Sequence, residues 1–339
     1  MIHRSLACRS AIAATVAVCL PAWLIAGQAS QKPAPHTTHK AAPVKRSIPR
    51  GPDGRPDLSG IWSFATVTPL ERPAELGNKA VLTDAEAVEF EKQIIAREDK
   101  DSRDGGAEAD VSRAYNDFWW DRGTKVVGTH RTSLIIDPPD GRIPPLTPEA
   151  QKRSAAVAQR MQAPPNGPED RNLSERCLLG FNSGPPMLPS AYNNNVHVAQ
   201  TRDHVLLLNE MIHNSRIVPL DGRRHGHILQ WAGDSRGHWQ GDTLVVDTTN
   251  FSTSNFRNAS PTMHLVERFT RVDATTLMYE FTVDDPNTWT RPWTVQLPMT
   301  MSAEPMYEYA CHEGNYAMQG MLAGARAKEK AEQEGTKKQ

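Results

Sequence analysis

The stretch QWAGDSRGHWQGDTLVVDTTNF, residues 230–251, contains two β-prone runs around Arg-Gly and Gly-Asp turn signals. The second run, residues 243–249, places Leu and Val among polar residues, as expected for a half-buried strand. We therefore predict a β-hairpin with Gly241 in the turn before Thr243.

The sequence after this hairpin repeats the same pattern. Residues 263–272, 277–284 and 293–299 are each predicted to form a strand, with a tight turn at residues 273–275. Together they form an antiparallel meander. Because unpaired edges invite association, so long a meander closes on itself or packs on a second sheet. We expect a mainly β fold that closes into a barrel, with a β-sandwich as the alternative.

The N-terminal residues 1–29 have the layout of a secretory signal peptide. Arg4 and Arg9 precede an apolar run over residues 11–26. A membrane anchor is the alternative, but Pro21 interrupts the run, which is shorter than the roughly 20 residues of a spanning helix. We expect cleavage, a periplasmic or secreted mature chain, and no membrane span in it.

The rest of the chain divides by composition. Residues 30–55 are rich in Lys, Pro and His and are expected to be a disordered linker, residues 56–325 a single β-rich domain, and residues 326–339 a charged tail. The net charge of −1 argues against a nucleic-acid partner, which normally requires a basic face. We expect a small-molecule ligand or substrate instead. Oligomeric state is left open.

Two of the four cysteines, Cys8 and Cys19, lie in the expected leader. Cys177 and Cys311 then remain, and in an oxidising compartment such a pair is expected to form a disulfide. A loop of this length contributes about 4–5 kcal/mol in the chain-entropy model. The alternative is a catalytic thiol or a metal ligand.

Helices are expected only as insertions in the β domain. Thr83 and Glu86 have capping-box spacing at the start of a helix to about residue 98. Thr147 and Pro148 fit the N-cap and first position of a second helix, to about residue 161. Between them, residues 131–137 (RTSLIID) are predicted to form a strand.

The tripeptide Gly60-Ile61-Trp62 opens the first expected strand. It resembles the start of lipocalin-like (calycin) barrels. The resemblance implies that Trp62 closes the barrel floor and that a late arginine, Arg268 or Arg271, packs on it. An ordinary first strand with a core tryptophan is the alternative.

Several longer segments resemble a large family of exported, mostly uncharacterised bacterial proteins. They include PDLSGIW, NEMIHNSRIVPLDGR and GDSRGHWQGDTLVVDTTNF, and the resemblance covers nearly the whole mature chain. It implies export but transfers no catalytic residues. The site must therefore be sought from the chemistry of the residues.

The strand expected over residues 263–272 carries one candidate acid. Alternation puts Glu267 on the face of Leu265 and Phe269, and His264 on the other face. A buried Glu267 needs a partner or a raised pKa, and either is a common mark of a site. The alternative is a structural Glu beside an Arg.

A second cluster follows the apolar run at residues 205–208. Glu210, His213 and Arg216 offer the groups needed to abstract a proton, return it and hold an anion. We expect these three to meet His264 and Glu267 across the sheet in one catalytic pocket. A solvated strand end is the alternative.

Neutral oxygen donors precede the next strand. Tyr192 and Asn194 belong to a Tyr-Asn-Asn-Asn run that could bind a polar ligand, or Ca²⁺ together with Asp284 and Asp285, although a tight turn is the alternative. The sequence contains no GxGxxG, P-loop, GxSxG or HExxH motif, so no cofactor other than Ca²⁺ is expected.

Aromatic and titratable groups near the C-terminus complete the candidates. Trp289 and Trp293 could stack a flat ligand, with core packing as the alternative. His312, next to Cys311, would be fixed by the expected disulfide and could contact a ligand.

These features favour an exported hydrolase or lyase. We expect His/Glu/Arg acid–base chemistry that hydrolyses or eliminates a bond in a small aromatic or apolar molecule, an aryl ether being one specific case. The alternative is a non-catalytic small-molecule carrier or structural β-barrel protein. A pocket with convergent titratable groups would favour catalysis, and a smooth apolar cavity would favour carriage.

Overall fold

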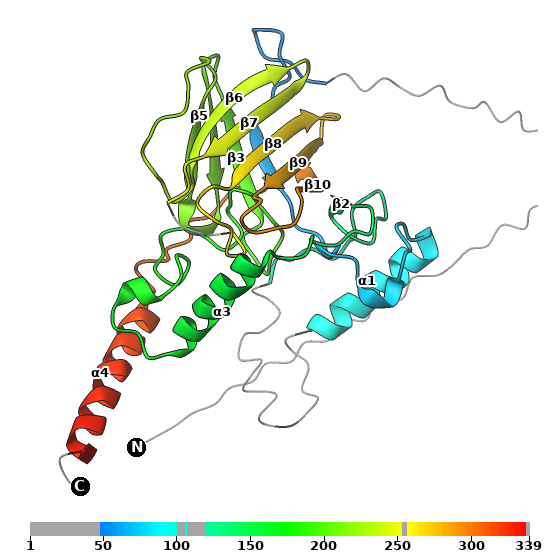
Figure 1. Cartoon of the computed structure of the whole chain (residues 1–339). Helices are drawn as coiled ribbons and strands as arrows, with labels where there is room; N and C mark the ends of the chain where they lie inside the picture. Colours follow the sequence, from blue (N-terminus) through cyan, green and yellow to red (C-terminus); the bar gives the residue numbers. More distant parts are fainter. Residues whose placement is uncertain (1–47, 100–105, 107–119, 253–255, 337–339) are drawn as a thin grey trace, which may run out of the picture. The chain divides into compact units, whose positions relative to one another are not determined.

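The computed structural model describes residues 48–99, 106, 120–252 and 256–336. The expected signal peptide and most of the expected linker lie outside the described residues. The described residues belong to one compact unit, Arg46–Gln339. Its fold is mainly β, with one ten-stranded antiparallel sheet that nearly closes into a barrel (Figure 1). The expected fold class is therefore confirmed.

The strand order is β5-β4-β3-β1-β10-β9-β8-β7-β6, and β2 pairs with β10 off this path. The strands are β1 (Gly60–Ser63), β2 (Ile135–Asp137), β3 (Asn195–Gln200), β4 (His204–Asn209), β5 (Ser215–Pro219), β6 (Asp234–Gln240), β7 (Thr243–Thr249), β8 (His264–Arg271), β9 (Thr276–Asp284) and β10 (Trp293–Met301). The expected meander is thus β6 to β10, and β1 joins it to β3–β5.

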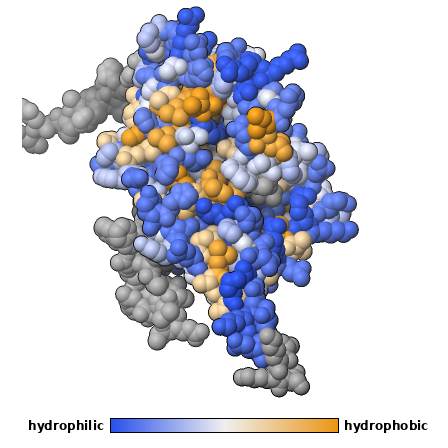
Figure 2. All heavy atoms as spheres, turned by 90° about the vertical axis from the view of Figure 1, so that its left-hand side faces the viewer, coloured by the Kyte–Doolittle hydropathy of each residue, from blue (hydrophilic) through white to orange (hydrophobic). Residues whose placement is uncertain are grey.

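One seam of the barrel, between β5 and β6, is not closed by a strand pairing in the described structure. The two strands still pack closely there. A Cβ atom at Gly237 would lie 2.8 Å from Cγ1 of Val218 and 2.6 Å from Cδ2 of Leu220, so a larger residue would require these side chains to shift. On the side of the molecule seen in Figure 2, apolar side chains gather in several separate patches.

The barrel interior is filled by side chains. Along β8 the buried residues alternate, and Leu265, Glu267 and Phe269 share one face, as expected; the structure shows that this face is the inner one. Neighbouring strands contribute large buried residues to the same core: Trp62, Leu207, Leu244, Tyr279, Phe281 and Trp293. The inside of the barrel is therefore a packed core.

Trp62 and Arg271 close one end of the barrel. The Arg271 guanidinium lies 5.1 Å from the centre of the Trp62 ring, and Trp62 Nε1 donates to the carbonyl of Leu58 at 2.9 Å. Arg271 also donates to the carbonyls of Asp57 and Ala274. The late arginine is thus Arg271, as the resemblance to calycin barrels implied for one of the two candidates.

The hairpin and the two expected helices are confirmed. β6 and β7 pair from Gln240 and Thr243 outward, around Gly241 at φ 60°. Helix α1 (Asp84–Glu98) has the complete Thr83 capping box, and α3 (Pro148–Gln162) is capped by Thr147. Short 3-10 turns are η1 (Ala74–Leu76), η3 (Pro168–Asp170) and η4 (Met211–His213).

Structure is also seen at both expected ends of the domain. Helix α4 (Tyr316–Thr336) runs through the expected boundary at residue 325, because its Ala-, Glu- and Lys-rich sequence favours a helix as well as a charged tail. At the other end, Arg50 pairs with Asp242 of the β6–β7 turn, so the last residues of the expected linker contact the barrel. The helices in the described parts of the chain are all too short or too polar to cross a bilayer.

Cys177 and Cys311 form the expected disulfide, with their Cα atoms 5.7 Å apart. The bond joins the segment before β3 to the segment before α4. It therefore holds two connecting segments together outside the strand pairing.

Candidate active site

Arg216 and Glu267 meet inside the barrel. Arg216 donates two hydrogen bonds to the Glu267 carboxylate, at 2.6 and 2.9 Å, and Glu267 is 0% exposed. Tyr279 Oη donates to Glu267 at 2.7 Å and accepts from the backbone N–H of Met187 at 3.1 Å. The pair is therefore bidentate, buried and supported by a third group.

The pKa shifts around this pair are those of a buried ion pair. Burial alone would lower the pKa of Arg216, but the charge of Glu267 more than offsets it and the pKa is raised. Burial and Glu267 raise the pKa of Tyr279 well above its ordinary value, so Tyr279 remains a hydrogen-bond donor. The geometry matches the alternative of a structural Glu beside an Arg.

The other expected catalytic residues do not join this pair, and the expected convergence is wrong for them. His264 lies on the outer face of β8, with Nε2 2.6 Å from Oδ2 of Asp247, because alternation sends it away from Glu267. His213 is exposed at the end of η4. Glu210 precedes η4, and the left-handed backbone at Ile212 (φ 58°) turns the chain between Glu210 and His213.

Glu210 lies instead in a hollow of about 500 Å³ outside the barrel core. The hollow is formed by the start of β3, the end of β4 and the connection from β10 to α4. Its lining residues are Asp121, Tyr192, Asn193, Asn195, Glu210, Glu304, Pro305, Tyr307 and Tyr309. Three of these are acidic, three are tyrosines, and none is Lys, Arg or His. We call this hollow the acidic pocket.

Glu210 is held rigidly at the base of the acidic pocket. It is 6% exposed. Asn195 Nδ2 donates to its Oε2 at 2.7 Å, and the backbone N–H of Tyr307 donates to its Oε1 at 3.3 Å. These two donors fix the direction of the carboxyl group.

Asp121 is the second carboxylate of the acidic pocket. It stays open to solvent, but surrounding protein atoms and the charge of Glu210 raise its pKa. Its backbone is fixed on both sides, because Asp121 N donates to the carbonyl of Ala191 and Asn194 Nδ2 donates to that of Asp121 at 2.6 Å. Two carboxylates whose environments differ in this way can divide the roles of acid and base.

Asn194 is a positioning residue and does not line the acidic pocket. Its side chain is fully buried and also bonds Ser190, with Ser190 N donating to Oδ1 at 2.8 Å. The turn alternative for this amide run is therefore what the structure shows, and the ligand contact expected of Asn194 is wrong. Tyr192, in contrast, is in the pocket wall, where its ring stacks on Tyr309 with centroids 6.3 Å apart.

Two of the expected Ca²⁺ ligands, Asp285 and Asn194, make hydrogen bonds within the protein. Asp285 is buried and accepts hydrogen bonds from Ser260 N at 2.6 Å and from the Thr288 hydroxyl at 2.6 Å, so its oxygens close a turn. Asn194 is committed to Asp121 and Ser190, as described above. Among the described residues, no group of three or more His, Cys, Asp or Glu side chains is arranged to hold a metal ion.

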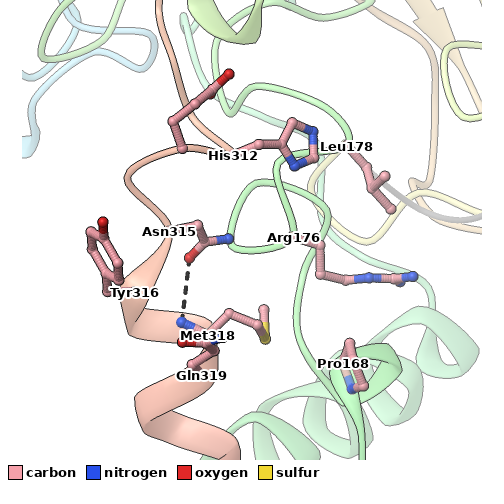
Figure 3. Close-up of a pocket in the computed structure, with 9 residues that line it drawn as sticks. Pro168, Arg176, Leu178, His312, Asn315, Tyr316, Met318 and Gln319 are labelled. Atoms are coloured by element: carbon pink, nitrogen blue, oxygen red, sulfur yellow. Dashed lines mark hydrogen bonds between the residues drawn. The ribbon is translucent and has the colours of Figure 1, made fainter.

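The remaining expected ligand residues lie elsewhere. Trp289 and Trp293 are buried in the core with Phe256 and Phe281, so packing, the alternative, is their role. His312 lines a separate hollow of about 440 Å³ beside the disulfide (Figure 3). Figure 3 shows Asn315 bonding the backbone of Met318, while His312 makes no marked hydrogen bond to the other side chains drawn.

Besides Pro305, four residues of the acidic pocket were not expected from the sequence. Tyr307, Tyr309 and Glu304 occur in the segment EPMYEYACH. Its two tyrosines close to Cys311 are a sequence pattern that could have indicated a binding site. Asp121 has no comparable signal, because it follows two tryptophans in a segment without regular structure.

Comparison of the chain with models of known protein families and with curated proteins found no match. The geometry of the acidic pocket is therefore the basis for a functional proposal.

Proposed function

We propose that this chain is an exported acid–base enzyme that acts in the acidic pocket. It hydrolyses or eliminates a bond in a small aromatic or otherwise apolar molecule, with Asp121 as general acid and Glu210 as general base. The observation that carries the proposal is the pair itself. Two carboxylates share one hollow, burial and the charge of Glu210 raise the pKa of Asp121, and hydrogen bonds from Asn195 and the Tyr307 backbone fix the position of Glu210.

The proposed step divides proton transfer between the two carboxyl groups. Protonated Asp121 gives its proton to the leaving-group oxygen as the substrate bond breaks. Glu210 takes a proton from the attacking water in a hydrolysis, or from carbon in an elimination. A proton then moves from Glu210 to Asp121 through solvent and restores both groups. Cleavage of an aryl ether is one specific case, since the leaving oxygen would accept from Asp121.

The tyrosines supply the binding surface for the substrate. The stacked rings of Tyr192 and Tyr309 form an aromatic wall, and Tyr307 lies at the rim with 70% of its surface exposed. Aromatic rings prefer offset-stacked or edge-to-face contacts with other rings. This wall therefore favours a flat, apolar substrate over a flexible polar one.

Carriage of a ligand inside the barrel has less support. A carrier of this shape holds its ligand in an open interior, whereas large side chains fill the interior here. The disulfide supports an exported location, because such bonds persist in oxidising compartments.

The experiment that tests the proposal incubates the purified chain with a pool of small aromatic ethers and esters and follows products and bound compounds by mass spectrometry. We expect products from the wild type, with and without EDTA, and a strong loss with Glu210→Gln. A compound that is retained but never converted would contradict the proposal and favour a carrier. So would product formation that Glu210→Gln leaves unchanged.

A further inference from the structure

A second hollow carries the opposite charge. It has a volume of about 590 Å³ and is formed by α3, the segment after α3, and the loops that contain Trp231 and Arg257. Four arginines line it, Arg160, Arg171, Arg176 and Arg257, against a single acidic residue, Glu169. We call it the arginine pocket.

Within the described residues, Arg171 is the one of these arginines whose side chain donates hydrogen bonds to the protein. Arg171 donates to the carbonyls of Met161 and Ala163, at 2.7 and 2.9 Å, and so fixes the end of α3. Within the described part of the chain, the guanidinium groups of Arg160, Arg176 and Arg257 make no hydrogen bond and no ion pair with a carboxylate. Three cationic groups around one hollow are thus available to a ligand.

The guanidinium group of Arg257 is partly desolvated by the surrounding protein. Its side chain remains accessible to solvent, but protein atoms around the guanidinium lower its pKa, and Glu71 only partly offsets this. A partly desolvated cation without a hydrogen-bonded partner is unfavourable by itself. A bound anion would compensate it.

The arginine pocket also has exposed aromatic surface. Trp231 is 39% exposed and Phe181 is 52% exposed, and both line the hollow. The Arg176 guanidinium lies 6.0 Å from the centre of the Trp231 ring, which fixes the ring next to the charge. An aromatic plane next to guanidinium groups suits a ligand with a ring at one end and an oxyanion at the other.

We propose that the arginine pocket binds a small aromatic oxyanion, an aryl carboxylate or an aryl phosphate. Arg160, Arg176 and Arg257 hold the oxyanion, and Trp231 and Phe181 contact the ring. The site shares no lining residue with the acidic pocket, although the Phe181 ring contacts the Tyr192 ring edge to face with centroids 5.7 Å apart, and it does not depend on the chemistry proposed there. The Cys177–Cys311 disulfide adjoins Arg176 and fixes the backbone that carries it.

Calorimetric titration of the full chain tests the proposal with four probes: benzoate, phenyl phosphate, inorganic phosphate and benzyl alcohol. We expect at least one of the two aromatic anions to bind at least tenfold more tightly than both inorganic phosphate and benzyl alcohol. If benzoate binds more tightly, the pocket prefers a carboxylate, and if phenyl phosphate does, it prefers a phosphate. Binding should weaken as salt is raised from 50 to about 500 mM, because the attraction is ionic.

Two variants localise the binding. Arg176→Gln and Arg160→Gln should each lower the affinity for the preferred anion by about tenfold or more. Because Arg160 is exposed at the end of α3, its replacement should leave the fold intact. Arg202→Gln, an exposed arginine in the β3–β4 turn, is the matched control and should bind as the wild type does. Unchanged affinity in both pocket variants would overturn the proposal, as would equal binding of benzyl alcohol.

Discussion

The barrel interior and the acidic pocket each hold a pair of charged side chains, and the two pairs behave in opposite ways. Inside the barrel, Arg216 and Glu267 neutralise each other and are closed off from solvent. In the acidic pocket, Asp121 and Glu210 have the same charge, and Asp121 remains open to a ligand. The carboxylate of the first pair accepts three hydrogen bonds from Arg216 and Tyr279, whereas in the proposed function the second pair exchanges a proton with a substrate. Pairing and access, rather than residue type, separate a structural unit from a site.

Replacement of the base in the acidic pocket should have the largest effect. Glu210→Gln keeps the size of the side chain but cannot accept a proton, so we expect turnover to fall by roughly 10²- to 10⁴-fold. Stability should change by less than about 1 kcal/mol, because an amide can keep one of the two hydrogen bonds. Steady-state kinetics and urea unfolding measure the two quantities.

Glu308→Gln provides the matched control for that variant. Glu308 lies between Tyr307 and Tyr309 in the same segment, but it is exposed and does not line the acidic pocket. We expect wild-type turnover. An equal loss in both variants would show that a general change in this segment, rather than the Glu210 carboxylate, is responsible.

Replacement in the barrel should give the reverse pattern. Glu267→Gln leaves the Arg216 charge buried without its partner, so we expect a loss of about 3–5 kcal/mol in the free energy of unfolding. The double variant Arg216→Met/Glu267→Met removes both charges and should recover part of that loss. Urea denaturation measures all three proteins. If Glu267→Gln unfolds at the wild-type midpoint, the pair is not the structural unit described here.

Tyr309→Ala should have a moderate effect on substrate binding. It removes the ring stacked on Tyr192, and an aromatic contact contributes about 0.5–1.5 kcal/mol beyond the buried area. We therefore expect KM to rise by roughly 3- to 10-fold with little change in kcat. A fall in kcat with unchanged KM would argue against a binding role for this wall.

Replacement of Asp121 should have the smallest effect, which is a change in the pH dependence of stability. Its pKa is raised in the folded state, so the folded chain holds this proton more tightly than the unfolded chain. Its contribution to stability therefore decreases as pH rises from the ordinary pKa of Asp through the raised value. Asp121→Asn should remove that decrease, which thermal unfolding at a series of pH values will show. Identical pH profiles would mean that neither burial nor Glu210 raises the pKa of Asp121 in the folded chain.

The parts of the fold that are set by residues a few positions apart could be predicted from the sequence. Alternation in β8 placed Glu267 and His264 on opposite faces of the strand, without showing which face is inside, and the spacing of Thr83 and Glu86 located the start of α1. Both patterns depend only on neighbours a few residues apart. The disulfide was predictable from the cysteine count and the expected export.

The site was less predictable because it is assembled from connecting segments. Glu210 was recognised, but its partner Asp121 is 89 residues earlier and is fixed by Asn194 and Ala191, contacts that no local pattern encodes. Conversely, Glu267 and Arg216 have the residue types of a site. Only their mutual hydrogen bonds, with Tyr279 as a third member, identify them as part of the core.

The most direct test of the account is a crystal structure of the Glu210→Gln variant soaked with the compound that the wild type converts. The account predicts electron density for the unreacted compound in the acidic pocket, with its leaving oxygen within hydrogen-bond distance of the Asp121 carboxyl group and its ring against Tyr192 or Tyr309. Density for the compound inside the barrel, or at another surface with the acidic pocket empty, would contradict it.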